Sequence, residues 1–519
     1  MKPEKVPADV WMEVFGHINH PPTLLNVSLA SKAFRDFAFR TLHRHLIWRK
    51  PQDVVISLPV FTANPGLHVY VRTLRVGVST LPEPLGGFIV DETGVIMQRT
   101  AGEITSIDHT RLNKSLRYYS SESSSLFANR ALHDSMIDRI TGFINLENLT
   151  FYNVIFTFQH FTLLHALPQL RKLHVEFCIF PLRSRTPILD HSTLPLTDLT
   201  MVNLRRRLID WNDGNHVTVE EDVTHILTLA TAYNLRSLRV DSTADVFRYV
   251  FRANSWDNRP PPYTIPAHLE RLYVQRKQVF PGKIQPMFPG EGTFPDNYCF
   301  QFLWRAPSIR TLSLCTYTDL HRSPPADALP HLHHYAGQVE SAVPMSQGRP
   351  VEALALTFGQ DVRQGISALS AVGQHFPELK MLSLLMKEWE HEVIHVVSHQ
   401  FKKLRRLKIV FELGGPSEDM VVSLGPEYFI LMPELHTVQI FPAPDNGSRK
   451  PAHPEHLFDP SFDSIEEELQ NLVIPWNRFC PTLREVQLMA GWVMNRGFEG
   501  NAWKMSKVDE YDTLEDFRY

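Results

Sequence analysis

The chain has 519 residues, of which 43% are hydrophobic and 21% are charged, so it can bury a large core. Its 52 Lys and Arg against 56 Asp and Glu give a net charge of -4, which argues against a protein whose main partner is nucleic acid or an anionic membrane. No stretch reaches the roughly 18–20 apolar residues of a membrane span, and the first residues lack the apolar centre of a signal peptide. We therefore expect an intracellular protein of the cytoplasm, the nucleus or both.

The four cysteines do not indicate a redox or metal site. None of them lies in a C-x-x-C motif, so we expect neither a disulfide framework nor a cysteine zinc site. The phosphate-binding and nucleophile motifs G-x-x-x-x-G-K-(S/T), G-x-G-x-x-G and G-x-S-x-G do not occur either. We expect no catalytic residue, no cofactor and no bound metal, and therefore a protein that is not an enzyme.

The first fifty residues form a unit of three short predicted helices. Pro7 suits the first turn of a helix, and the residues after it are apolar at helical spacing. Pro21 and Pro22 end that helix and can begin the second. Ser31 is a suitable N-cap for the third helix, whose apolar stripe is expected to continue to Leu46.

This N-terminal unit carries more large apolar residues than one inward stripe per helix requires. They are Trp11, Phe15, Leu24, Leu25 and Phe34. The surplus fits either an apolar face for a partner or packing on the rest of the same chain, and composition does not decide between them. The unit also holds 8 Lys and Arg against 4 Asp and Glu, a local excess of positive charge.

The order and spacing of these residues resemble the F-box family over residues 5–48. The matching elements are VPADVWMEVF at 6–15, Leu24-Leu25, and SLASKAFR at 28–35. The family usually opens with Leu-Pro-x-Glu, so Val6 and Asp9 are departures from its pattern.

The F-box resemblance implies a partner and a set of contact residues. The partner would be the Skp adaptor, which is acidic in that family and joins the protein to a cullin ubiquitin ligase. The implied adaptor-binding residues are Pro7, Val10, Val14, Phe15, Leu24, Leu25, Leu29 and Phe34.

From about residue 67 a phrase recurs: an apolar residue, two residues of any kind, an apolar residue, one of any kind, and an apolar residue. Its twelve copies begin at Val71, Leu146, Leu170, Leu196, Leu235, Leu269, Ile309, Val351, Leu379, Leu404, Leu435 and Leu483. The phrase is typical of leucine-rich repeats, in which its last two apolar residues alternate along a short strand and point into the core. Return segments are expected to be helical, as over residues 388–401, and neighbouring repeats must stack to cover each other.

The predicted fold class is therefore α/β: a three-helix F-box followed by an irregular solenoid similar to that of leucine-rich-repeat F-box proteins, which are abundant in fungi. The predicted domains are the F-box at 1–50, the solenoid at 51–505 and an acidic tail at 506–519. Stretches rich in Pro, Gly or Ser are expected to be inserted loops. They lie at about 79–130, 259–266, 280–295 and 441–460.

Two histidine clusters are candidate metal sites. His391-Glu392-x-x-His395 matches the zinc-peptidase motif, in which two His one helical turn apart bind zinc. On a helix, however, His391 and His395 fall opposite the apolar residues Val393 and Val397, so we expect a solvated stripe. A metallopeptidase is the alternative. The cluster between residues 331 and 334 is expected to be a polar loop or helix surface.

The third and fifth positions of each phrase point away from the core and form the expected ligand face. The candidate substrate-binding residues there are Arg75, Lys172, His174, Arg239, Arg271, Tyr273, Arg406 and Lys408. Their positive charge favours an acidic or phosphorylated protein target, although ordinary solubilising side chains would look the same. The predicted function is substrate recognition in a Skp adaptor–cullin (SCF-type) ubiquitin ligase, without nucleic acid or membrane partners. The alternative is a leucine-rich-repeat scaffold that acts outside a ligase.

Overall fold

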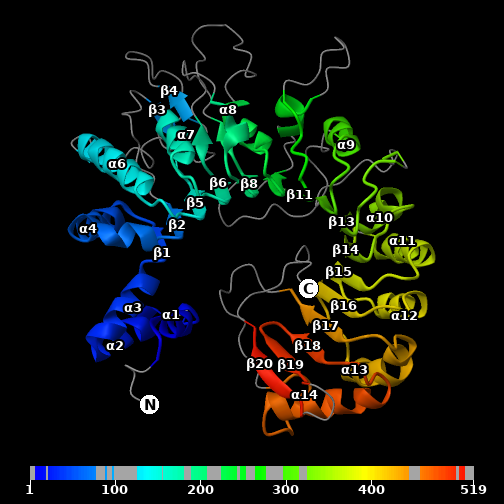
Figure 1. Ribbon diagram of the computed structural model, residues 1–519. Coiled ribbons are helices and arrows are strands. Elements are labelled where there is room, and N and C mark those ends of the chain that lie inside the picture. The colour runs from blue at the N-terminus through cyan, green and yellow to red at the C-terminus, as the bar shows by residue number, and fades with distance from the viewer. Residues whose placement is uncertain are drawn as a thin grey trace, which may run out of the picture. The chain divides into compact units, whose positions relative to one another are not determined.

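The fold is taken from a computed structural model of the whole chain (Figure 1). The described residues are 6–18, 21–77, 88–90, 96–98, 125–154, 156–180, 189–206, 224–241, 246–252, 263–275, 296–314, 324–325, 327–359, 361–443, 456–497 and 502–508. The chain divides into two compact units, and each is described by itself. The first comprises Met1–Leu269 with Lys277–Ile284, and the second comprises Glu270–Arg276 with Gln285–Tyr519.

Three helices begin the first unit at the positions that the sequence predicts. They are α1 (Ala8–Gly16), α2 (Pro21–Ala30) and α3 (Lys32–Leu42). Pro7 stands directly before α1, where its missing N–H costs no hydrogen bond. Ser31 caps α3, because its side-chain oxygen accepts a 3.0 Å hydrogen bond from the Phe34 N–H.

The three helices enclose a small apolar core of their own. Phe15, Leu24 and Ala38 are buried at its centre. The partly buried residues that pack against it are Trp11, Ile18, Val27, Phe34, Phe37 and Leu42. The Phe34 ring lies edge-on to Trp11 and Phe15, with centroid distances of 4.9 and 5.7 Å. Phe15 and Leu24 are therefore buried by neighbouring helices.

The third helix is shorter than predicted, and the expectation that it reaches Leu46 is wrong. It ends at Leu42, and Leu46 lies in strand β1 (His45–Trp48). β1 pairs in parallel with β2 (Thr73–Val76), so that Leu46 and Trp48 are register partners of Leu74 and Val76. The first strand of the repeat region thus lies inside the segment assigned to the F-box.

The remainder of the first unit repeats a short parallel strand and a helical return. After β2 the strands are β5 (Asn148–Tyr152), β6 (Lys172–Glu176), β8 (Asp198–Val202) and β10 (Ser237–Asp241). The helical returns are α4 (Pro51–Ala63), η2 (Pro65–Tyr70), α6 (Ser125–Thr141), α7 (Phe158–His165), η3 (His191–Thr193), α8 (Thr224–Leu227), η4 (Thr228–Thr231) and η5 (Val246–Val250). Short pairs are formed by β3 (Phe88–Val90) with β4 (Ile96–Gln98) and by β7 (Ile179–Phe180) with β9 (Arg205–Arg206).

The strands of the first unit end in a repeated turn. Asn153, Phe177 and Asn203 have φ angles of 54°, 53° and 55°, and each stands seven residues after the start of its phrase. The N–H groups of Asn153 and Phe177 donate to carbonyls at the end of the next strand. The N–H of Asn203 donates to Oδ2 of Asp241 at 2.8 Å. These bonds link successive repeats at the ends of their strands.

The second unit has the same repeat and a different end. Its parallel strands are β11 (Arg271–Gln275), β12 (Thr311–Leu314), β13 (His334–Gln338), β14 (Ala353–Thr357), β15 (Met381–Glu388), β16 (Arg406–Leu413), β17 (Thr437–Pro442) and β18 (Glu485–Met489). The returns are α9 (Asp296–Trp304), α10 (Val339–Ser346), α11 (Val362–His375), α12 (His391–Gln400), α13 (Glu418–Ser423), η6 (Leu424–Tyr428), η7 (Phe429–Leu431), α14 (Ile465–Val473) and η8 (Ile474–Arg478). Two antiparallel strands, β19 (Trp492–Asn495) and β20 (Lys504–Lys507), complete the sheet after β18.

All twelve predicted phrases supply a parallel strand, and all three apolar residues of each phrase are buried. Within each unit, helices such as α6 and α7, or α10 to α12, lie on one face of the strands (Figure 1). The α/β fold of leucine-rich-repeat type is therefore confirmed for each unit. No helix within the described ranges combines the length and the hydrophobicity that crossing a bilayer requires.

Strand β13 was not predicted, because its phrase has glycine in the third apolar position. The phrase is Leu332, Tyr335 and Gly337. The Tyr335 ring occupies the space that a side chain at Gly337 would need, and its hydroxyl lies 2.7 Å from Oγ of Ser341. The large ring and the glycine together replace two ordinary core residues.

The predicted insertions agree only in part with the structure. Helix α6 begins at Ser125, inside the loop predicted at 79–130, and β17 extends into the loop predicted at 441–460. Residues 263–266, which belong to the predicted loop at 259–266, form neither helix nor strand. The loop at 280–295 lies outside the described residues, as does most of the acidic tail, whose first two residues belong to β20.

Candidate protein-binding surfaces

Helices α1 and α2 expose four large apolar side chains that their shared core does not use. Val10 and Val14 on α1 are 49% and 45% exposed, and Leu25 and Leu29 on α2 are 53% and 83% exposed. Each pair is spaced i, i+4, so its members lie on the same face of their helix. We call these four residues the exposed apolar pairs.

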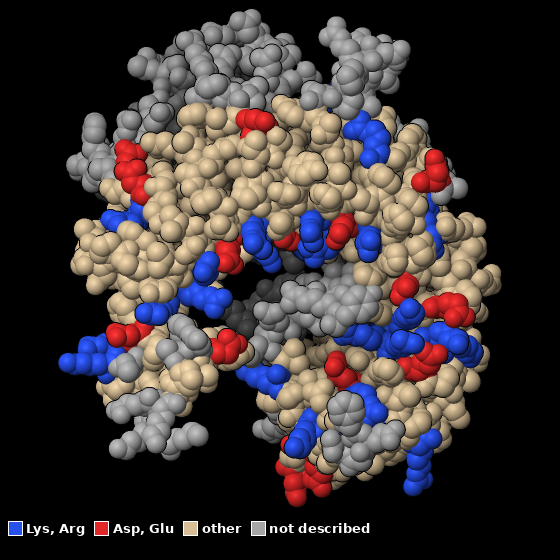
Figure 2. Space-filling model, viewed as in Figure 1, with Lys and Arg blue, Asp and Glu red and all other residues tan. Residues whose placement is uncertain are grey.

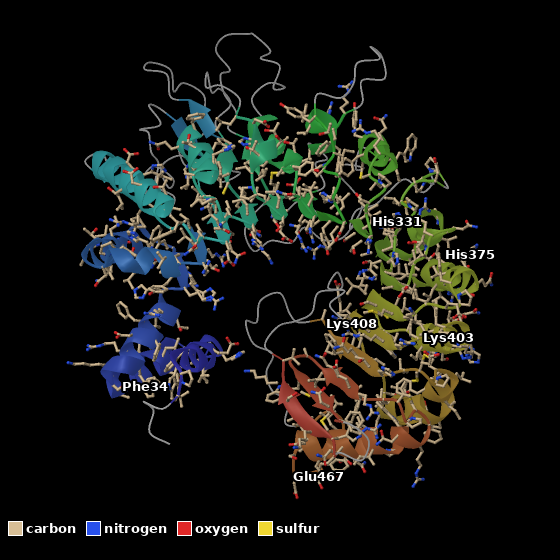
Figure 3. The ribbon with its side chains drawn as sticks, viewed as in Figure 1. Phe34, His331, His375, Lys403, Lys408 and Glu467 are labelled. Carbon is tan, nitrogen blue, oxygen red and sulfur yellow. The ribbon has the colours of Figure 1, made fainter. Side chains whose placement is uncertain are left out.

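The structure divides the eight predicted adaptor-binding residues into two groups. Pro7 and the exposed apolar pairs are open to solvent. Phe15 and Leu24 lie in the three-helix core, and Phe34 packs against it, where Figure 3 shows its position within the helices. Residues of the second group would act by holding the helices together, and residues of the first group can touch a partner.

Exposed basic side chains lie on the third helix of the same unit. Lys32, Arg35 and Arg40 on α3 and Arg44 after it are exposed. The acidic side chains described on α1 and α3 are Glu13, which lies 3.3 Å from His17, and Asp36. The local positive excess seen in the sequence is therefore a property of the surface, which suits an acidic partner.

In the first unit the strand pairing aligns the third and fifth phrase positions into two columns. The third-position column is Thr73, Asn148, Lys172, Asp198 and Ser237. The fifth-position column is Arg75, Thr150, His174, Thr200 and Arg239. Figure 2 shows Lys and Arg gathered with some Asp and Glu over these strands.

Two of the predicted substrate-binding residues in this unit already have neighbours. The Arg75 guanidinium carbon lies 5.4 Å from the centroid of the Tyr152 ring, at cation–π distance. Nε2 of His174 lies 3.1 Å from Oε2 of Glu176. The strand face of the first unit is therefore a mixed polar surface that includes a carboxylate.

In the second unit the predicted substrate-binding residues form two separate groups. Arg271 and Tyr273 lie on β11, and Arg406 and Lys408 lie on β16. The fifth positions on the strands between them carry small side chains: Ser313, Ala336, Ala355 and Ser383. Lys408 is only 9% exposed, and its ammonium group lies 5.8 Å from the centroid of the Phe441 ring. Figure 3 shows Lys408 on the strand side of the unit and Lys403 on its helical side.

The zinc-peptidase motif lies on the exposed face of α12. His391, Glu392 and His395 are exposed, whereas Val393 and Val397 are buried. This arrangement is the solvated stripe that the helical projection predicts. Among the described residues, no group of three or more His, Cys, Asp or Glu is arranged to hold a metal ion.

The other histidine cluster is placed differently from the expectation. His331 is exposed and His333 is half-buried, but His334 is the first residue of strand β13. Its Nδ1 lies 3.2 Å from the Thr311 hydroxyl on the neighbouring strand. The expected loop or helix surface is therefore wrong for His334.

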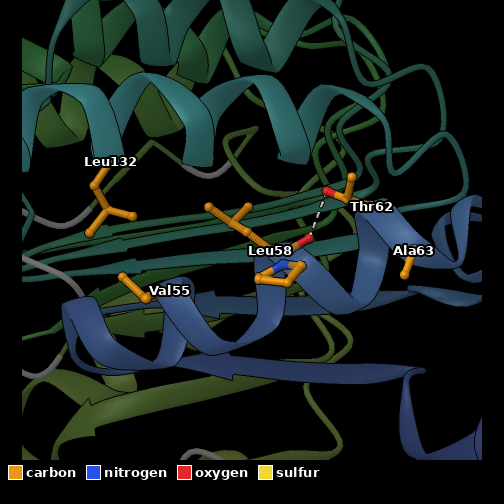
Figure 4. Close-up of a pocket in the computed structure, with 6 residues that line it drawn as sticks. Val55, Leu58, Thr62, Ala63 and Leu132 are labelled. Atoms are coloured by element: carbon orange, nitrogen blue, oxygen red, sulfur yellow. Dashed lines mark hydrogen bonds between the residues drawn. The ribbon is translucent and has the colours of Figure 1, made fainter.

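Sequence reasoning missed an apolar groove beside helix α4. The groove has a volume of about 570 Å³ and lies between α4 and α6 (Figure 4). Its lining consists of Val55, Leu58, Pro59, Thr62, Ala63 and Leu132. Helix α4 has large apolar residues on its solvent side as well as on its buried side: Val54 and Phe61 are buried, while Val55, Ile56 and Val60 are exposed. The run of apolar residues beyond one inward stripe was the available signal.

Comparisons with known proteins give distant structural likenesses alone. No protein-family model and no curated protein matches the chain. The LRR ectodomain of the plant membrane receptor kinase GASSHO1/SCHENGEN3 from Arabidopsis thaliana matches with 11% identity and a TM-score of 0.23, over 59% of this chain and 28% of that one. The TLR13–ssRNA13 complex matches with 14% identity and a TM-score of 0.30, over 68% and 50%. The mouse RP105/MD-1 complex matches with 12% identity and a TM-score of 0.27, over 59% and 52%.

The chain thus spans between about a quarter and a half of the length of these three structures. At these scores the likenesses carry no argument about fold or function. Each unit is a repeat of strand and helical return by its own strand pairing and buried core.

Proposed function

We propose that the protein is a non-catalytic substrate receptor of a Skp adaptor–cullin ubiquitin ligase. Helices α1–α3 would bind the adaptor, and the strand face would bind a protein substrate. The observation that carries the proposal is that the three helices bury Phe15 and Leu24 among themselves and still expose Leu25 and Leu29. Large apolar side chains exposed in this way on a small unit are typical of a binding surface.

The order of residues on α1–α3 supports the identity of this partner. The segments that resemble the F-box family coincide with the three helices and with the Ser31 cap. The exposed basic residues Lys32, Arg35 and Arg40 suit the acidic surface of the adaptor in that family. The departures at Val6 and Asp9 leave the scaffold function, without a ligase, as the competing hypothesis.

The mechanism would be proximity, with no bond chemistry contributed by this chain. Binding of the adaptor through one surface and of the substrate through another makes the encounter of substrate lysines with the ubiquitin-charged enzyme effectively intramolecular. The columns of polar side chains on the strands would select the substrate. Lys172 and Arg271, which are exposed in their columns, favour a substrate segment with negative charge.

A double substitution on the exposed apolar pairs tests the proposal. Leu25→Ser with Leu29→Ser removes two exposed side chains and leaves Leu24 in the core, so the helices should stay folded. A control replaces two exposed apolar residues of the second unit, Val422→Ser with Ile474→Ser. Each protein is tagged, purified and analysed by mass spectrometry for the Skp adaptor and cullin.

We expect the wild type and the control to retain adaptor and cullin, and the Leu25/Leu29 variant to lose both. Recovery of adaptor by the Leu25/Leu29 variant at the level of the control would overturn the proposal. A wild-type protein that recovers partners but no cullin would support the scaffold function in its place. Far-ultraviolet circular dichroism should show the same helix content in each variant as in the wild type.

A further inference from the structure

A second, smaller pocket lies in the first unit at the edge where strands β6, β8 and β10 begin. Its volume is about 310 Å³, near the lower end of the roughly 300–1,000 Å³ that ligand pockets occupy. The polar side chains in its lining are Gln169, Arg171, Thr197, Asn234, Arg236 and His268. Two prolines complete the lining. The pocket is thus small and rich in hydrogen-bond donors.

The repeat brings the two arginines to this pocket although 65 positions separate them in the sequence. Arg171, Thr197 and Arg236 each stand directly before a strand. The Arg171 carbonyl accepts hydrogen bonds from the N–H groups of Thr197 and Asp198 at 2.8 and 3.0 Å. The Thr197 carbonyl accepts in the same way from Arg236 and the next residue. These bonds fix the three residues in one row.

The row places a short residue between two long ones. Neighbouring strands are about 4.8 Å apart, so the backbones of Arg171 and Arg236 are roughly 10 Å apart, within reach of two arginine side chains that converge on one group. The Thr197 side chain is short, and its hydroxyl lies 3.2 Å from the carbonyl oxygen of Arg171 and 2.8 Å from Oδ2 of Asp198. The space above Thr197 is therefore left to the guanidinium groups.

The pocket has positive charge without an internal counter-ion. No Asp or Glu belongs to its lining among the described residues, and within that part of the chain the side chains of Arg171 and Arg236 make no hydrogen bond or ion pair. Of the nearby carboxylates, Glu147 is bound to Arg72 at 2.9 Å, and Asp198 accepts a hydrogen bond from the Thr197 hydroxyl at 2.8 Å. Two guanidinium forks thus keep their donors available beside one small cavity.

We propose that this pocket binds a phosphate-like oxyanion, with Arg171 and Arg236 as its two charged ligands. A guanidinium group presents parallel N–H donors that match two oxygens of such an anion. His268 and the side-chain amides of Gln169 and Asn234 supply further donors around it. The oxyanion is either a free small anion or a phosphorylated side chain of another protein. The site does not depend on the ligase proposal, since it involves none of the helices α1–α3.

Calorimetric titration of the full chain with two probes tests the site. The first probe is inorganic phosphate, and the second is the peptide acetyl-Gly-phosphoserine-Gly-amide, with its unphosphorylated counterpart as a blank. The variants are Arg171→Ala, Arg236→Ala and the double substitution. The control is Arg310→Ala, which removes an exposed arginine at the same phrase position in the second unit, outside the pocket.

We expect each pocket substitution to weaken binding by about tenfold or more, as for the loss of a charged hydrogen bond, and the control to bind as the wild type does. Arg171→Lys should fall between wild type and Arg171→Ala, because it keeps the charge and loses the fork. Binding of phosphate alone indicates a free anion, and binding of the phosphopeptide alone indicates a protein-borne group. Equal binding by the double variant and the control, or no binding of either probe by the wild type at millimolar concentration, overturns the proposal.

Discussion

The rings of His133 and His160 lie with their centroids 5.2 Å apart on the neighbouring helices α6 and α7, and both residues are fully buried. Neither nitrogen of His133 has a hydrogen-bond partner among the described residues, and neither has Nε2 of His160. Burial lowers the pKa of His160 to about 3, with the nearby His133 as a second cause. Burial also lowers the pKa of His133, although Asp134, whose Oδ1 is 3.6 Å from Nδ1, partly opposes the shift.

These two histidines should make the first unit sensitive to acid. In the unfolded chain a histidine takes up its proton near pH 6.5, whereas folded His160 does so only near pH 3. Their contribution to stability is therefore complete above about pH 6.5 and is lost as the pH falls toward 3, by up to about 1.4 kcal/mol per pH unit for each group. Melting temperatures measured between pH 7.5 and pH 4.5 should show this decline.

Replacement of His133 by leucine isolates the contribution of the buried histidines to the acid sensitivity of the first unit. His133→Leu removes one buried titrating group that has no hydrogen bond to lose, so the variant should be less sensitive to acid than the wild type. His375→Leu, at an exposed position of the second unit, serves as the control and should keep the wild-type pH dependence. An identical decline in wild type and His133→Leu would show that the buried pair is not responsible.

The packing around strand β13 predicts that replacing Gly337 by a larger residue destabilises the fold. A methyl group there would meet the ring and hydroxyl of Tyr335 and approach the Leu314 carbonyl at 3.3 Å, so Gly337→Ala should cost about 1–3 kcal/mol of unfolding free energy. Gly66→Ala has nothing within 4 Å of the new methyl group and should have little effect. Urea unfolding of both variants makes the comparison, and equal midpoints would contradict the packing described for β13.

The strands of the twelve phrases could be predicted from the sequence for a simple physical reason. In each phrase three fixed positions are buried, as at Leu146, Leu149 and Phe151, and the alternation of strand side chains forces apolar residues there. Two unpredicted parallel strands, β1 and β13, break this pattern at one position each. Strand β1 has His43 where the first apolar residue would stand, and β13 has Gly337 where the last would stand.

The surfaces were harder to predict than the strands. The sequence of α2 does not reveal which of Leu24 and Leu25 faces inward, because that depends on how three short helices pack. The anion pocket left a clear signal, since Arg171 and Arg236 occupy the same phrase position two repeats apart. That signal becomes visible only when the phrases are aligned as rows of stacked strands.

Glu468 provides a test of the C-terminal part of the second unit. Its buried carboxylate accepts hydrogen bonds from three successive N–H groups, those of Leu457, Phe458 and Asp459, at 2.7, 2.6 and 2.9 Å. Glu468→Ala leaves three donors without a partner and should lower the unfolding free energy by roughly 3 kcal/mol or more. Glu467→Ala, which removes an exposed carboxylate on the same helix (Figure 3), should cost far less. Similar urea midpoints for the two variants would show that the hydrogen bonds of Glu468 to residues 457–459 do not stabilise this part of the unit.

The contrast between Leu24 and Leu25 tests whether the N-terminal helices form a folded unit with a spare surface. Leu24 is 4% exposed, so Leu24→Ala should cost about 2–5 kcal/mol and melt α1–α3, whereas Leu25→Ala should leave their stability within about 0.5 kcal/mol of the wild type. Hydrogen exchange of the α1–α3 amides, followed by mass spectrometry, measures this locally. Loss of protection in both variants would mean that Leu25 is held by a neighbour and cannot offer its side chain to a partner. Protection retained in Leu25→Ala, together with weakened adaptor binding, separates binding from folding at adjacent positions of one helix.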